Sequence, residues 1–170
     1  MVFVDEFSGR ADWPLLQNGA VNLYWRSELF EEAILSLKNL NYRILKLRFD
    51  NFDQFKLDLS SSLKWHEQFG YTPWVGNLNA LDDGLRGEPF NSSTRSVICI
   101  SNYDSLVKYD GDFAYKILDI IERTSRDYLL FGKVLIGLIQ TNDPTYCCEG
   151  IGATNTHWNL REWKNASRGL

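Results

Sequence analysis

The sequence predicts a single α/β domain in which helices flank a three-stranded parallel sheet, with an N-terminal extension and a polar C-terminal tail. Short apolar segments with strand-like patterns recur at 42–49, 95–100 and 133–140. Segments of helical periodicity separate them, and this alternation is typical of parallel strands joined by right-handed crossovers. At 170 residues, the chain also has the size of one domain with one hydrophobic core.

Composition suggests where the domain begins and ends. Residues 1–13 show no sustained apolar period, and we interpret them as a flexible arm. The folded domain is expected over 14–144. Beyond it the chain becomes polar and rich in glycine, so 145–170 is expected to form a C-terminal extension with little core of its own.

The first elements follow from the hydrophobic pattern. Residues 20–25 alternate weakly and indicate a possible edge strand. From Ser27, a plausible cap, a helix is expected because its apolar side chains recur three or four residues apart, at Leu29, Phe30, Ala33, Ile34, Leu37 and Leu40. Residues 42–49 then alternate with a period of two, as in a half-buried strand.

The later elements are assigned in the same way. A second helix is expected from 52 to about 66, a loop over 69–76, and a short helix that begins near Asn77 and ends before Gly87. A further helix is expected over 112–126. The segments 95–100 and 133–140 are rich in Val and Ile, which is typical of strands buried on both faces of a parallel sheet.

Charge and hydropathy exclude several classes of partner. The formal net charge is −4, which argues against a nucleic acid partner and suits a basic protein instead. No run approaches the roughly 20 apolar residues that a membrane span needs. Residues 1–6 also lack the basic and then apolar pattern of a secretory leader. We therefore expect a cytoplasmic protein with no membrane partner.

The three cysteines, Cys99, Cys147 and Cys148, fit a reducing compartment, because neighbouring cysteines rarely bridge without strain. Cys99 lies in an apolar run and is expected to be buried. A metal site made of Cys147, Cys148 and His157 is an alternative. However, no CxxC pair accompanies these residues, whereas zinc sites usually have four ligands. The interpretation that we favour has no metal and no cofactor.

The common enzyme motifs are absent. The chain has no GxSxG elbow, no phosphate-binding glycine loop ending in Lys-Ser or Lys-Thr, and no HExxH. Its two histidines, His66 and His157, fall at a predicted helix end and in the polar tail, where a solvated side chain is ordinary. We therefore predict no enzymatic activity and no catalytic residues.

The most concentrated feature is an aromatic loop that opens a short helix with an acidic outer face. In one interpretation, Asn77 caps the helix while Asp82 and Asp83 solvate it, although acids late in a helix are unfavourable to its dipole. In the other, a carboxylate flanked by Trp74 and Tyr71 enters a cationic pocket built for phosphate and satisfies its Arg and Lys donors. Physical reasoning on these residues leaves both interpretations open.

A resemblance to a known family favours the second interpretation. The barstar family of ribonuclease inhibitors has the signature aromatic-Gly-Asn-Leu-Asp-Ala-Leu-x-Asp-x-Leu, and residues 76–85, which read GNLNALDDGL, are similar to it. The order strand, helix, loop, short helix, strand, helix, strand over 42–141 also resembles that fold. The resemblance covers the expected domain and leaves out the arm and the tail.

Position by position, the resemblance implies roles for the residues of the loop and the short helix. Asp83 matches the acid that reaches deepest into the nuclease site, and Asn77 matches a polar residue at the start of the inhibitory helix. Tyr71 and Trp74, which precede Gly76, stand roughly where the family has aromatic loop residues that pack on the enzyme.

Two positions depart from the family pattern. Asn79 stands where an acid is usual, and Asp82 stands where an aromatic residue is common, so one charge has moved by three positions along the same helix. The expected partner-binding residues are therefore Tyr71, Trp74, Gly76, Asn77, Asn79, Asp82 and Asp83.

The expected function is that of a barstar-like immunity protein, a stoichiometric inhibitor that occludes the active site of a basic ribonuclease or nuclease toxin. One alternative is a binding module of the same fold whose partner is not a nuclease. Another is an enzyme that holds a metal with Asp82 and Asp83. Adjacent helix residues point about 100° apart, however, and no third ligand is near them in sequence.

Overall fold

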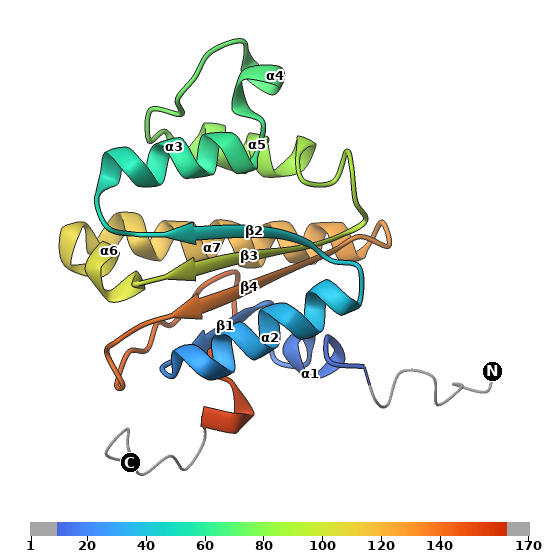
Figure 1. Ribbon diagram of the computed structural model, residues 1–170, viewed down its shortest axis with the longest axis vertical. Coiled ribbons are helices and arrows are strands. Elements are labelled where there is room, and N and C mark those ends of the chain that lie inside the picture. Colours follow the sequence, from blue (N-terminus) through green and yellow to red (C-terminus); the bar gives the residue numbers. More distant parts are fainter. Residues whose placement is uncertain (1–9, 163–170) are drawn as a thin grey trace.

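The computed structural model describes residues 10–162 and shows an α/β fold (Figure 1). Five strands form one all-parallel sheet in the order β2-β3-β4-β1-β5. The strands are β1 (Val21–Tyr24), β2 (Arg43–Arg48), β3 (Arg95–Ser101), β4 (Val134–Gln140) and β5 (His157–Trp158). The predicted fold class and parallel sheet are confirmed, whereas the predicted number of three strands is wrong.

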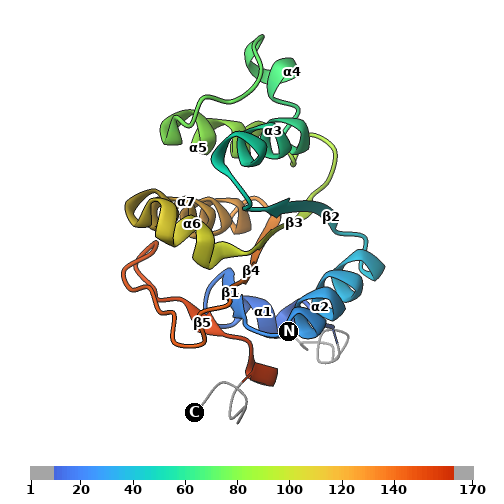
Figure 2. The ribbon, with the colours of Figure 1, turned by 60° about the vertical axis from the view of Figure 1, so that its left-hand side comes forward.

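Helices lie on both sides of the sheet (Figure 2). The helices are α1 (Trp13–Leu16), α2 (Ser27–Asn39), α3 (Phe52–Ser62), α4 (Trp65–Phe69), α5 (Leu78–Gly87), α6 (Tyr103–Tyr109) and α7 (Gly111–Leu129). A short 3₁₀ helix, η2 (Leu160–Glu162), follows β5. Side chains of α3, α5, α6 and α7 build one core cluster with the sheet, while those of α1 and α2 build another on the opposite face.

The three predicted strands form one half of the sheet. The side chains of β3 and β4 are almost entirely buried, as expected for strands covered on both faces. In β2 only alternate positions are buried near the end of the strand, which agrees with the predicted period of two. The sequence pattern therefore identified these strands and their inner faces correctly.

Strand β1 is not at an edge, in contrast to the prediction. It lies between β4 and β5, and all four of its residues are buried. Its polar Asn22 interrupts the apolar pattern in the sequence. The side chain is nevertheless buried, because its amide nitrogen donates to the carbonyl oxygens of Leu15 and Ala20. The edge is formed by β5, whose residues His157 and Trp158 pair with β1.

The segment expected to be a polar extension contributes to this sheet. Ile151 is fully buried, and the buried carboxylate of Glu162 accepts hydrogen bonds from the backbone N–H groups of Trp25 and Arg26, just before α2. These anchors are one isolated apolar residue and one acid, so no hydrophobic period reveals them. The remainder of the predicted arm and tail, residues 1–9 and 163–170, lies outside the described residues.

The helix expected over 52–66 is divided in two. Lys64 adopts a left-handed conformation with a φ of 49°, which ends α3 and starts the short helix α4 in a new direction. The result is that α4 lies above α5 (Figure 1) instead of extending α3. Within residues 10–162, no helix combines the length and the apolar character that a bilayer span needs.

Candidate functional site

Asn77 fixes where α5 begins. Its side-chain Oδ1 accepts hydrogen bonds from the backbone N–H groups of Asn79, at 2.9 Å, and Ala80, at 3.2 Å. These N–H groups belong to the first turn and have no partner within the helix, so a capping side chain stabilises the helix by about 1 kcal/mol. The predicted cap is confirmed, and it holds the rest of α5 in a defined orientation.

Helix α5 buries one face and exposes the opposite one. Leu81 and Leu85 are each about 2% exposed and point into the core, while Leu78 packs at its margin. Asn79 and Asp83 are exposed, as the helical spacing predicts. Within residues 10–162, the carboxylate of Asp83 makes no hydrogen bond or ion pair.

Asp82 points in a different direction from its neighbour. Its Oδ1 accepts a hydrogen bond from the hydroxyl of Thr124 at 3.3 Å and lies 3.5 Å from the guanidinium of Arg86. Arg86 in turn lies 3.0 Å from Asp127 of α7. Asp82 therefore joins α5 to α7, and its carboxylate is less available to a partner than the sequence suggested.

The two acids also do not come together as metal ligands. Within residues 10–162, no three side chains of His, Cys, Asp or Glu gather closely enough to hold a metal ion. This finding applies to the pair Asp82 and Asp83, and also to Cys147, Cys148 and His157.

Trp74 lies inside the molecule, although the sequence placed it among the contact residues. Its side chain is fully buried, and its ring packs 6.0 Å from that of Phe113 and 6.2 Å from that of Trp65. The indole N–H donates to the carbonyl oxygen of Asn77 at 2.8 Å, and the backbone N–H donates to the hydroxyl of Ser60. Trp74 thus anchors the loop in front of α5 and does not face a partner.

Two aromatic rings remain exposed beside α5. Tyr71 is 42% exposed and Phe69 is 36% exposed, and their ring centroids lie 6.4 Å apart. Both rings also approach Trp65, with centroids 4.4 Å away for Phe69 and 6.2 Å away for Tyr71. Tyr71 was expected among the contact residues. Phe69 was not, because it falls at the beginning of the predicted loop over 69–76.

Gly84 explains how the ring of Phe69 comes close to the acidic helix. A Cβ atom at this position would lie 2.6 Å from the ring of Trp65 and 3.5 Å from the ring of Phe69. Helix α4 therefore packs directly on the backbone of α5, next to Asp83. We call the exposed residues Phe69, Tyr71, Asn79 and Asp83 the acidic-aromatic face.

Gly76 has a separate reason to be glycine. Its φ is 93°, a conformation that side chains rarely adopt, and a Cβ atom there would lie 3.1 Å from the ring of Phe52. The turn that leads into α5 thus depends on this position. Gly76 supports the site through its backbone.

The close packing at Gly84 predicts a measurable cost. We expect Gly84→Ala to lower the free energy of unfolding by about 1–3 kcal/mol, because the added methyl group must displace the ring of Trp65. Gly111→Ala is a matched control at another helical glycine, since a Cβ atom added there would meet nothing within 4 Å. Urea denaturation of both variants measures the difference, and equal stabilities would contradict the packing described.

Comparison of the chain with protein-family models, curated proteins and solved structures found no match. The function of the acidic-aromatic face is therefore argued from its own geometry.

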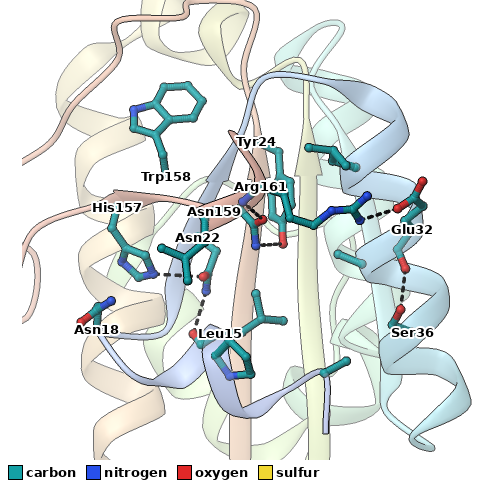
Figure 3. Close-up of a pocket in the computed structure, with 15 residues that line it drawn as sticks. Leu15, Asn18, Asn22, Tyr24, Glu32, Ser36, His157, Trp158, Asn159 and Arg161 are labelled. Atoms are coloured by element: carbon teal, nitrogen blue, oxygen red, sulfur yellow. Dashed lines mark hydrogen bonds and ion pairs between the residues drawn. The ribbon is translucent and has the colours of Figure 1, made fainter. Parts of the chain in front are cut away.

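A second feature is a hollow of about 330 Å³ between α1, α2 and the segment 157–161 (Figure 3). The polar side chains that line it form hydrogen bonds and an ion pair with one another. Asn159 donates to the hydroxyl of Tyr24 at 3.0 Å, and Arg161 pairs with Glu32 across the opening. These contacts join residues more than a hundred positions apart in the chain, so they hold the C-terminal segment against β1 and α2.

His157 belongs to this set of contacts (Figure 3). Its Nε2 lies 3.0 Å from the Oδ1 of Asn22, whose amide nitrogen already donates to two carbonyl oxygens. Since Oδ1 can only accept, Nε2 carries a proton, and a second proton on the buried Nδ1 would have no acceptor among the described residues. Burial lowers the pKa of His157 below its ordinary value of 6.5, which is consistent with a neutral ring.

The lowered pKa predicts a pH dependence of stability. The unfolded chain takes up a proton at His157 more readily than the folded chain, so stability is complete above about pH 6.5 and falls as the pH decreases toward the folded-state pKa. We expect the melting temperature to fall between pH 7.5 and pH 5.5, and to fall less in His157→Gln. His66→Gln, a change in α4 away from β1, is the control and should behave as wild type. An identical fall in His157→Gln and wild type would contradict this role.

Proposed function

We propose that this chain is a barstar-type inhibitor that binds a basic ribonuclease and occludes its active site. The observation that carries the proposal is the state of Asp83. Its carboxylate is exposed on a capped helix and has no partner among residues 10–162, and the next residue, Gly84, lies against the ring of Phe69. A free charge held by rigid elements suits an interface better than it suits folding.

The arrangement of elements supports the finer fold assignment. Strands β2, β3 and β4 are adjacent and in sequence order, and the chain between them contains α3, α4, the loop, α5, α6 and α7. Apart from the short helices α4 and α6, this is the order expected from the resemblance to the barstar family. Strands β1 and β5, together with α1 and α2, are then additions that extend the sheet on its β4 side.

The chemistry of inhibition follows from the acid and its surroundings. A ribonuclease binds the phosphate of its substrate with Arg, Lys and His side chains, and a carboxylate can accept hydrogen bonds from the same donors. Asp83 would enter that pocket while Tyr71 and Phe69 cover its rim and exclude water. Aromatic anchors around a buried charge are typical of residues that dominate binding energy.

The cysteines of the chain are compatible with an inhibitor that acts inside the cell it protects. The three cysteines of the chain are free, with Cys99 buried and Cys147 exposed. Free thiols fit the reducing cytoplasm, where an immunity protein would meet its toxin before secretion.

A second candidate is a binding module of the same fold whose partner is not a nuclease. It is favoured by Asp82, whose carboxylate is engaged with Thr124 and Arg86, and by Asn79, which is neutral. These two facts leave Asp83 as the free acid on the outer face of α5. Such a module would retain the aromatic rings but would not require a phosphate-binding pocket in its partner.

Association kinetics test the proposed function. Small basic extracellular ribonucleases are immobilised, and the chain is passed over them at low and at high salt. We expect at least one of them to bind, with an on-rate that falls several-fold as salt increases while the off-rate changes less, because opposite charges steer the encounter. Retention of none of them would favour the second candidate, and an on-rate that is indifferent to salt would contradict the electrostatic part of the proposal.

A further inference from the structure

A second exposed aromatic group lies at the end of the sheet to which the strands point. Helix α3 begins there, α6 ends there, and the loop before α5 passes close to them (Figure 1). The first residue of α3 is Phe52, the last of α6 is Tyr109, and the loop contains Val75. Tyr109 is 59% exposed and Val75 is 68% exposed, so both are unusually open for large apolar side chains. Nothing in the proposed action of Asp83 uses them.

The rings of this group are held rigidly. Phe52 and Tyr109 stack with centroids 5.3 Å apart and an angle of 21° between their planes. Phe52 also meets the ring of Phe113 at 5.3 Å, edge to face, and Phe113 in turn packs against the buried Trp74. The exposed rings are therefore continuous with the core, which lowers the entropy cost of using them in an interface.

Capping side chains at two helix starts fix the positions of the rings. The Oδ1 of Asn51 accepts from the backbone N–H of Gln54 and starts α3 immediately before Phe52. The Oδ1 of Asp110 accepts from the N–H of Phe113 and starts α7 immediately after Tyr109. Gly76, beside Val75, lies against the ring of Phe52. Three helices and one loop thus present one surface, which we call the sheet-end patch: Phe52, Val75, Tyr109 and Phe113.

The charge around the patch indicates what it would bind. Asp110 and Asp112 are exposed at its border, and neither carboxylate makes an ion pair among residues 10–162. On the other side, the ammonium group of Lys56 lies 5.0 Å from the ring centroid of Phe52. One cation of the chain itself therefore already rests on this aromatic surface, where cation–π attraction is favourable.

We propose that the sheet-end patch is a second partner-binding surface, which receives arginine side chains of a basic protein partner by stacking on Tyr109 beside Asp110 and Asp112. Guanidinium groups stack on aromatic faces and pair with carboxylates at the same time, so they match both features of the patch. The same carboxylates repel a phosphate backbone, which disfavours nucleic acid as the occupant. The class of partner rests on the proposed function, but the patch lies on different residues from Asp83.

The test uses the full chain labelled with ¹⁵N and titrated with a hexaarginine peptide at physiological salt. We expect saturable amide shifts at 75–76 and 109–113, and weaker binding of hexalysine, whose ammonium groups stack less well. Tyr109→Ala should weaken hexaarginine binding by about fivefold, the loss expected for one exposed cation–π contact. Val75→Lys should also weaken it several-fold, because the added ammonium group repels the peptide. Val75→Lys changes an exposed loop residue, so it remains informative if loss of the Tyr109 ring disturbs folding.

Tyr115→Ala is the matched control, because Tyr115 is exposed on the next turns of α7 but lies outside the patch. It should bind hexaarginine as wild type does. Shifts confined to other residues, wild-type affinity in both patch variants, or the same shifts with a single-stranded oligonucleotide would overturn the inference. The assay contains no nuclease, so it can fail while Asp83 proves essential for inhibition, and it can succeed when no ribonuclease is inhibited.

Discussion

Asp83→Ala is expected to abolish tight binding of the ribonuclease while leaving the fold intact. In the complex, the carboxylate would be removed from water among Arg and Lys donors, and its loss would leave those charges buried and unpaired, at a cost of about 2–5 kcal/mol. Affinity should therefore fall at least about 30-fold. In the free protein the side chain is exposed and makes no core contact, so its removal should change the free energy of unfolding by less than about 0.5 kcal/mol.

Isothermal titration calorimetry and thermal melting measure the two effects separately. Glu149→Ala is the matched control, since it removes one negative charge from another exposed position. It should reduce affinity only slightly, through the net charge. Unchanged affinity in Asp83→Ala would mean that α5 is not the inhibitory surface. A lower melting temperature would mean that Asp83 has a role in folding.

Leu135→Ala should produce the largest loss of stability among the changes considered. Leu135 is fully buried in β4, between β3 and β1, and faces the core cluster built with α7. Replacing it with alanine removes buried apolar surface and leaves a cavity that the sheet cannot close, at a cost of about 2–5 kcal/mol.

Leu130→Ala is the control for this change, because the same side chain is 83% exposed after the end of α7. Its stability should remain within about 0.5 kcal/mol of wild type. Urea denaturation gives both values under the same conditions. Leu135→Ala with the stability of the control would show that β4 is peripheral, in contradiction to the sheet order described.

Regular apolar periods made most of the fold predictable. Strand β2 and the helices α2, α5 and α7 bury apolar faces with periods of two or 3.6 residues, whereas β3 and β4 are continuous apolar runs. Each was expected near its observed position. Beyond β4, the pattern indicated β1 but not its central position, and it did not indicate β5. Strand β5 has two residues, and the C-terminal segment is docked by polar contacts such as Glu162 with the backbone before α2.

The candidate site was predictable in its backbone but less so in its side chains. The cap by Asn77 and the exposure of Asp83 follow from local rules for helix ends and faces. Whether Trp74 faces out or in depends on its packing against Trp65, across the turn between α4 and α5, and against Phe113 of α7. The same is true of Asp82, whose direction is explained only by Thr124 of α7.

The most direct test of the central claim is to titrate a ribonuclease with this chain and measure the remaining RNA cleavage. The enzyme should be a basic ribonuclease retained by the chain in the binding assay. We expect a linear loss of activity that reaches zero at one equivalent of inhibitor, with no comparable loss when Asp83→Ala is added instead. Full activity in a large molar excess of the wild-type chain would contradict it.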